Sequence, residues 1–90
     1  MKATKIKMKS GCTNGGLLEI DEIYVEGCTN PGFFKKEVLH KYLTNHPGKI
    51  QVNIWPYPDV IPAVSSNGEK YVRSAPNEWT HDNLLDLPRE

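Results

Sequence analysis

The sequence predicts an α+β domain in which one amphipathic helix packs on one face of a mainly antiparallel sheet of four or five strands, in the order ββαβββ. Three observations predict this class. Residues 2–9 alternate between lysines and other side chains, which is the period of a half-buried strand. Residues 34–43 carry apolar side chains at helical spacing. Asn67-Gly68 lies between two short β-prone runs, which indicates a hairpin.

Length and charge restrict the classes of protein that fit. With 90 residues, 38% of them hydrophobic, the chain forms one domain with one core. Its 11 basic and 11 acidic residues cancel, which argues against a dedicated nucleic-acid binder but allows a local patch. No apolar stretch approaches the roughly 20 residues that cross a bilayer, and no signal peptide is recognisable in residues 1–10. We therefore expect a cytoplasmic protein without a membrane segment, whose two cysteines are free thiols.

The first two strands are predicted over residues 2–9 and 17–26, antiparallel to each other. One side of the first strand carries Thr4, Ile6 and Met8. Its other side is a solvated row of Lys5, Lys7 and Lys9. The alternation of the second strand slips in its middle, which favours a bulge near Asp21 and Glu22. Its acidic residues are expected to lie opposite the lysines.

The helix is predicted to begin after Thr29-Asn30-Pro31-Gly32, because a capping side chain followed by proline is typical of a first turn. Its apolar stripe consists of Phe34, Val38, Leu39, Tyr42 and Leu43. It is predicted to end at Asn45-His46-Pro47-Gly48, since proline cannot continue a helix.

A third strand is predicted over residues 49–57, followed by a hairpin with arms at residues 60–64 and 70–74. In the tail, Asp82-Asn83 can start one helical turn, and Trp79 and Leu84 are expected to be buried as a strap over the sheet. The predicted core contains Ile6, Met8, Leu18, Ile20, Phe34, Val38, Leu39, Tyr42, Ile50, Val52 and Ile54.

The end of the chain resembles a known family. Residues 71–74 read Y-V-R-S, and residues 79–88 read W-T-H-D-N-L-L-D-L-P. These segments are similar to the closing strand and the W-T-x-x-N-L-L-x-L-P ending of family 3892 of the domains of unknown function, which are short bacterial domains. Met1-Lys2-Ala3 and Thr29-Asn30-Pro31 also look similar. The resemblance implies a compact bacterial α+β domain, and it implies no activity and no catalytic residue.

One candidate surface combines lysines with aromatic residues. The row of Lys5, Lys7 and Lys9 is basic. Trp55 and Tyr57, on the outer face of the third strand, are side chains of the kind that stack bases in single-strand binders. The simpler interpretation is a solvated lysine face, with the aromatic residues under the tail.

Cys28 is the most interesting chemical position. It is expected just before the helix, where the helix dipole would lower the pKa of its thiol. Free N–H groups at the same helix start could hold an anion, although capping by Thr29 and Asn30 competes with this. The spacing of His40 and His46 meets only half of a zinc pattern. We therefore assign no catalytic, cofactor-binding or metal-binding residue.

The function expected from the sequence is that of a small non-enzymatic binding or interaction module, with a protein favoured as its partner. One alternative is a nucleic-acid-binding module that uses the lysine row with Trp55 and Tyr57. The other is a thiol-dependent enzyme or redox module that uses Cys28.

Overall fold

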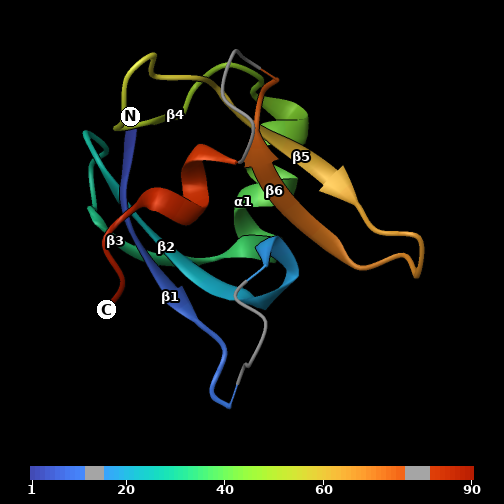
Figure 1. The fold of residues 1–90 in the computed structure, drawn as a ribbon. Coiled ribbons are helices and arrows are strands. Elements are labelled where there is room, and N and C mark those ends of the chain that lie inside the picture. The colour runs from blue at the N-terminus through green and yellow to red at the C-terminus, as the bar shows by residue number, and fades with distance from the viewer. Residues whose placement is uncertain (12–15, 77–81) are drawn as a thin grey trace.

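The computed structural model describes residues 1–11, 16–76 and 82–90 (Figure 1). The strands within them are β1 (Lys2–Met8), β2 (Ile20–Glu26), β3 (Gly32–Lys35), β4 (Gln51–Val52), β5 (Val60–Val64) and β6 (Lys70–Ser74). The helix is α1 (Lys36–Asn45), and the two short 3₁₀ helices are η1 (Leu17–Glu19) and η2 (Asn83–Asp86). The α+β class is confirmed, and the predicted order gains one short strand, β3, before the helix.

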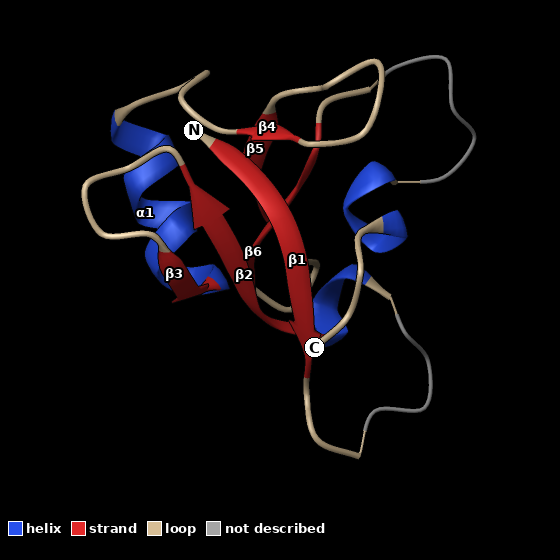
Figure 2. Cartoon of the chain, turned by 90° about the vertical axis from the view of Figure 1, so that its left-hand side faces the viewer, coloured by secondary structure: helices blue, strands red, loops and turns tan. Residues whose placement is uncertain are grey.

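The strands form two sheets. The larger sheet has the order β3-β2-β1-β4 and is antiparallel except for the parallel pair of β1 and β4. The strands β5 and β6 form a separate antiparallel hairpin. Both α1 and this hairpin lie behind the larger sheet in Figure 2, where β1 and β2 are nearest to the viewer. We call the side of the larger sheet away from α1 the outer face, and the side toward α1 the inner face.

The helix begins later than predicted. Residues 32–35 form β3, in which Phe34 lies opposite Ile23 of β2, and α1 starts only at Lys36. Two consecutive phenylalanines suit a pleated strand, because one ring can face the core while the other faces outward. The predicted capping by Thr29 and Asn30 is therefore wrong. The N-cap residue is Lys35, and the predicted end at Asn45 is confirmed.

Two extra residues displace the pairing of β1 and β2. Asp21 is an extra residue on β2, which confirms the bulge predicted there. Thr4 is an extra residue on β1, so the alternation of that strand shifts near its start. As a consequence Ala3 and Ile6 are the fully buried residues of β1, and Thr4 is half-buried with its hydroxyl oxygen enclosed.

The predicted third strand is much shorter than expected, whereas the predicted hairpin is confirmed. The strand β4 contains only Gln51–Val52, and a turn follows in which the backbone N–H of Tyr57 donates to the carbonyl of Ile54 at 2.7 Å. In the hairpin, β5 and β6 coincide with the two predicted arms. Gly68 in their connection has a φ of +83°, a conformation that favours glycine.

The core lies between the inner face of the larger sheet, α1 and the hairpin. Of the predicted core residues, Leu18 and Val38 are exposed, at 37% and 54%. The buried positions of α1 are Lys36, Leu39 and Leu43, so Val38 lies beside the buried stripe of the helix and not within it. The buried hydrophobic residues that the predicted core did not include are Ala3, Ile23, Val25, Leu43, Val60, Val72 and Leu87.

The C-terminal tail closes the core. Leu84 and Leu87 are 0% and 3% exposed, which confirms the predicted burial of Leu84; Trp79 lies outside the described residues. The carboxylate of Asp82 accepts a hydrogen bond from the N–H of Leu84 at 2.9 Å, so the predicted helical turn starts with a capping side chain. The N–H of Ile6 donates to the carbonyl of Pro88 at 2.9 Å, which holds the tail beside β1.

Candidate functional site

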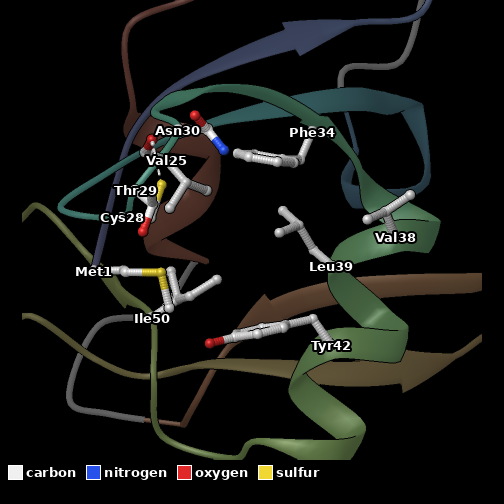
Figure 3. A pocket seen from close by; sticks show the side chains of 10 residues that line it. All are labelled: Met1, Val25, Cys28, Thr29, Asn30, Phe34, Val38, Leu39, Tyr42 and Ile50. Carbon is white, nitrogen blue, oxygen red and sulfur yellow. Dashed lines mark hydrogen bonds between the residues drawn. The ribbon is translucent and has the colours of Figure 1, made fainter.

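An apolar pocket of about 310 Å³ lies between α1, the inner face of β2 and β3, and the N-terminus (Figure 3). In Figure 3 the rings of Phe34 and Tyr42 form opposite walls, with Leu39 between them. Val38 stands at the right-hand side of the same view and is more than half exposed. The pocket is therefore lined mainly by side chains that pack against the core, and one exposed valine belongs to its wall.

Cys28 lines this pocket from the loop that connects β2 and β3. Its thiol is half-buried and donates a hydrogen bond to the carbonyl of Val25, with 3.8 Å between sulfur and oxygen. Because α1 begins at Lys36 with Lys35 as its N-cap, the predicted position of Cys28 directly before the helix is wrong, and the argument that placed its thiol at a helix start no longer applies. The predicted anion site at residues 29–32 depended on the free N–H groups of a helix start, and α1 does not start there.

His46, at the end of the helix, has a structural contact. The ring of His46 packs on the ring of Tyr42, with 4.8 Å between the ring centres. Among residues 1–11, 16–76 and 82–90, no group of three or more His, Cys, Asp or Glu side chains is placed to hold a metal ion. Cys12 and His81 lie outside these ranges.

The outer face of the larger sheet is the second candidate surface. Residues directly opposite each other on neighbouring strands share a face, so the register defines which side chains it carries. The opposite pairs on this face are Lys2 and Glu26, Lys5 and Tyr24, Lys7 and Glu22, Tyr24 and Phe33, and Glu22 and Lys35. The expectation that acidic residues of the second strand lie opposite the lysine row is thus confirmed for Lys7, which faces Glu22, whereas Lys5 faces Tyr24.

Three ammonium groups of this face lie over aromatic rings. The distances from Nζ to the ring centre are 4.9 Å for Lys2 over Tyr57, 4.9 Å for Lys5 over Tyr24 and 5.6 Å for Lys7 over Phe33. The rings of Tyr24 and Phe33 meet edge to face at 5.1 Å. We call these six residues the lysine–aromatic row.

The structure brings together only some of the residues that were predicted to form a nucleic-acid-binding surface. Lys5, Lys7 and Tyr57 belong to the row, whereas Lys9 instead approaches the carboxylate of Glu69 at 3.4 Å. Trp55 follows β4 and is 63% exposed. Sequence reasoning missed Tyr24 and Phe33, because residue 33 was expected at the start of the helix. Glu22 and Glu26 stand two residues before and after Tyr24, so they share its face of the strand, and they are the signal that could have placed its ring outward.

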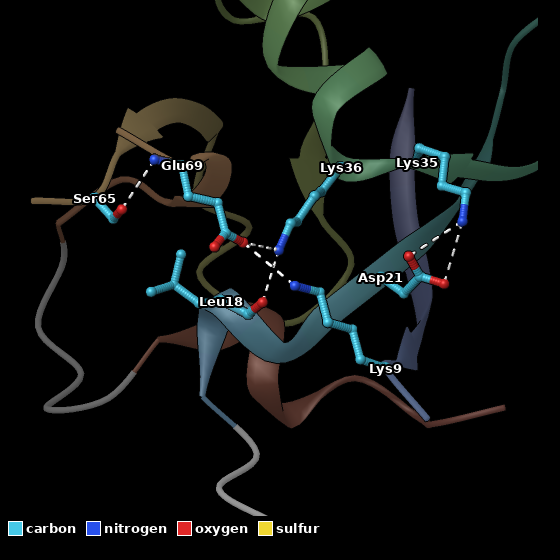
Figure 4. A network of polar contacts seen from close by, with 7 residues as sticks. All are labelled: Lys9, Leu18, Asp21, Lys35, Lys36, Ser65 and Glu69. Carbon is cyan, nitrogen blue, oxygen red and sulfur yellow. Dashed lines mark hydrogen bonds and ion pairs between the residues drawn. The ribbon is translucent and has the colours of Figure 1, made fainter. Parts of the chain in front are cut away.

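A buried cation lies at the first residue of α1 (Figure 4). The Lys36 side chain is 1% exposed, and its Nζ donates to the carbonyl of Leu18 at 2.7 Å and to the carboxylate of Glu69 at 2.6 Å. The hydrogen bond and the charge of Lys36 hold the pKa of Glu69 below its ordinary value. This network joins α1 to η1 and to the turn between β5 and β6, so its role is to connect elements of the fold.

A family model described as "Protein of unknown function (DUF3892)" matches residues 3–88. The chain belongs to the DUF3892 family. This confirms the resemblance inferred from the Y-V-R-S strand and the W-T to L-P ending. No curated protein and no solved structure matches the chain. Membership of the DUF3892 family therefore identifies the domain without assigning it an activity.

The described part of this DUF3892 domain contains no helix that is long and apolar enough to cross a membrane. The helix α1 has 10 residues, about half the length that a bilayer requires.

Proposed function

We propose that this domain is a small non-enzymatic binding module whose partner is a protein. The observation that carries the proposal is the apolar pocket between α1 and the inner face of β2 and β3. At about 310 Å³ it has the size of the smallest ligand pockets, which suits one large apolar side chain. Apolar anchors that enter such pockets supply much of the binding energy of protein interfaces.

The position of β3 also supports a protein partner. This strand ends the order β3-β2-β1-β4, so one side of its backbone faces no neighbouring strand of that sheet. Its Phe34 lines the pocket. An extended segment of a partner can pair with an edge strand while a side chain of the same segment enters a nearby pocket.

The proposed location is the cytoplasm of a bacterium. The family resemblance supports the source, and the half-buried free thiol of Cys28 suits a reducing compartment. Fractionation of native cells tests the location, and recovery of the protein in an oxidising compartment would contradict it.

Two exposed valines provide a matched test of the pocket. Val38 belongs to the pocket wall and is 54% exposed, whereas Val64 at the end of β5 is 57% exposed and does not line it. Val38→Glu should therefore abolish capture of the partner from native cells, while Val64→Glu should retain it. Because both side chains are largely in solvent, both variants should remain folded.

The captured protein must then bind in purified form. In a Cys12→Ser background, Cys28 is the one remaining thiol of the sequence and lines the pocket. Saturation with the partner should slow alkylation of Cys28 at least about tenfold, as expected for a covered side chain. Equal binding by the two valine variants, or an unchanged alkylation rate, would refute the pocket as the docking site.

The alternative of a thiol-dependent enzyme has lost its main physical argument. The thiol of Cys28 donates to a carbonyl and lies away from the start of the helix. We expect alkylation of Cys28 at the rate of an ordinary thiol at neutral pH. A much faster rate would restore the hypothesis of an activated nucleophile.

A further inference from the structure

We propose that the outer face of the larger sheet binds single-stranded nucleic acid, independently of the protein pocket. In this arrangement the bases stack on Tyr24 and Phe33, and the phosphates are held by the lysines of β1. The pocket is lined by inward-facing residues of β2 and β3, so the two sites lie on opposite sides of the same strands.

The charges of β1 are the first argument. The ion pairs between described residues do not include Lys2, Lys5 or Lys7. Lys35 of the same face is different, since its ammonium group pairs with Asp21 at 3.2 Å. Residues on one face of a strand repeat about every 7 Å, so the three unpaired lysines form a line of positive charge that an extended phosphate chain can follow.

The rings are the second argument, because the charge of the face is limited. Glu22 and Glu26 also lie on it, so the lysines exceed the carboxylates only slightly. Tyr24 and Phe33 lie on neighbouring strands and are half-buried. Aromatic rings on adjacent strands of an open sheet are the platform on which several RNA-binding domains stack successive bases.

The lysines that now cover the rings do not block this role. Contacts between an exposed ammonium group and a ring are weak, so a lysine can exchange the ring for a phosphate oxygen. The ring face that it leaves is then free for a base. Tyr57 under Lys2 extends the same arrangement toward β4.

These features favour a single strand over other anionic ligands. A duplex hides the faces of its bases, and so cannot use the rings. An acidic peptide can satisfy the lysines but leaves Tyr24 and Phe33 without a stacking partner. The combination of a cation line with adjacent rings is complementary to a chain that offers both phosphates and unpaired bases.

The test is fluorescence anisotropy with a labelled oligothymidine of about 12 nucleotides and with a matched duplex, at about 50 mM salt. The wild-type protein should bind the single strand in preference to the duplex. Lys5→Gln with Lys7→Gln should weaken binding about tenfold, and Tyr24→Leu should weaken it about fivefold through loss of stacking.

Matched variants separate the surface from general charge effects. Lys41→Gln with Lys70→Gln removes the same charge from exposed lysines of α1 and β6 and should leave the affinity within about twofold of wild type. Val38→Glu at the pocket should also retain binding of the single strand. If Val38→Glu removes protein binding alone, the two proposals are separated, and either can fail without the other.

Amide chemical shifts of the wild-type protein give a measurement that needs no variant. The single strand should shift resonances of β1, which does not line the pocket, together with those of β2 and β3, and shifts confined to residues that line the pocket would refute the proposal. It is also refuted if the single strand does not bind at low salt, if the duplex binds equally well, or if Tyr24→Leu has no effect. Equal losses in the two double lysine variants would likewise show a nonspecific attraction and refute it.

Discussion

The two sides of the larger sheet use lysine in opposite ways. On the inner side, Lys36 is buried and donates to the carboxylate of Glu69 and to the carbonyl of Leu18. On the outer side, Lys5 and Lys7 lie over aromatic rings and keep contact with water. A buried ammonium group is tolerated only when its donors are satisfied, whereas an exposed one needs no partner. The inner lysine therefore belongs to the fold, and the outer lysines are available for binding.

The largest effect should come from the apolar core on the inner side. Leu84→Ala removes a side chain that is 0% exposed, and should lower the free energy of unfolding by about 3–4 kcal/mol. Leu18→Ala is the control, because Leu18 is 37% exposed and its truncation should cost less than about 1 kcal/mol. Denaturant unfolding measures both. Similar losses in the two variants would mean that the tail does not close the core.

The second-largest effect on stability should come from the buried lysine, Lys36. Lys36→Met retains most of the apolar stem but removes the ammonium group, and should cost about 3 kcal/mol of stability because its acceptors lose their donor. The neighbouring Lys35 is exposed and pairs with Asp21 on the surface, so Lys35→Met should lower the stability far less than Lys36→Met does. A thermal unfolding series compares them. Equal losses of stability in the two variants would show that the buried lysine contributes no more to the fold than the exposed one.

Low pH should weaken the ion pair between Lys36 and Glu69. Lys36 holds the pKa of Glu69 below its ordinary value, so the carboxylate stabilises the fold at pH above that ordinary value of 4.5. This contribution is lost as the pH falls through the lowered pKa of the folded state. Glu69→Gln should therefore reduce the acid dependence of unfolding between about pH 5 and about pH 2, while Glu37→Gln on the exposed side of α1 should not. An unchanged dependence in Glu69→Gln would contradict the role of the pair.

The smallest effect on stability should come from the outer side. Lys5→Gln removes one contact between the ammonium group of a half-buried lysine and a ring, and should change the free energy of unfolding by less than about 1 kcal/mol. Denaturant unfolding at low and high salt measures this change. A large loss of stability would show that the outer lysines are part of the fold, and would weaken the case for a binding surface.

Local patterns predicted the elements whose signals are complete within a few residues. Asn67-Gly68 predicted the hairpin, and Pro47 with Gly48 predicted the end of α1. Asp82 predicted the short turn in the tail, because its carboxylate caps the following N–H group. The broken alternation around Asp21 predicted the bulge. In each case the physical cause lies in the backbone and side chains of neighbouring residues.

The start of the helix and the candidate sites depended on partners far away in the chain. Capping signals at Thr29 and Asn30 favoured a helix there, but pairing of Phe33 and Phe34 with β2 made this segment a strand. That pairing also placed Cys28 in the pocket wall, away from a helix start. The sequence contained the residues of the pocket but no signal for the later helix start that brings them together.

The amino-acid sequence alone predicted the α+β class, the hairpin, the end of the helix and membership of the DUF3892 family. Tertiary packing determined the parallel pairing of β4 with β1, the burial of Lys36 and the placement of three lysines over rings. The reason is that turns and caps are satisfied by adjacent residues, whereas strand pairing and the burial of charge depend on groups that only the folded chain brings within hydrogen-bonding distance.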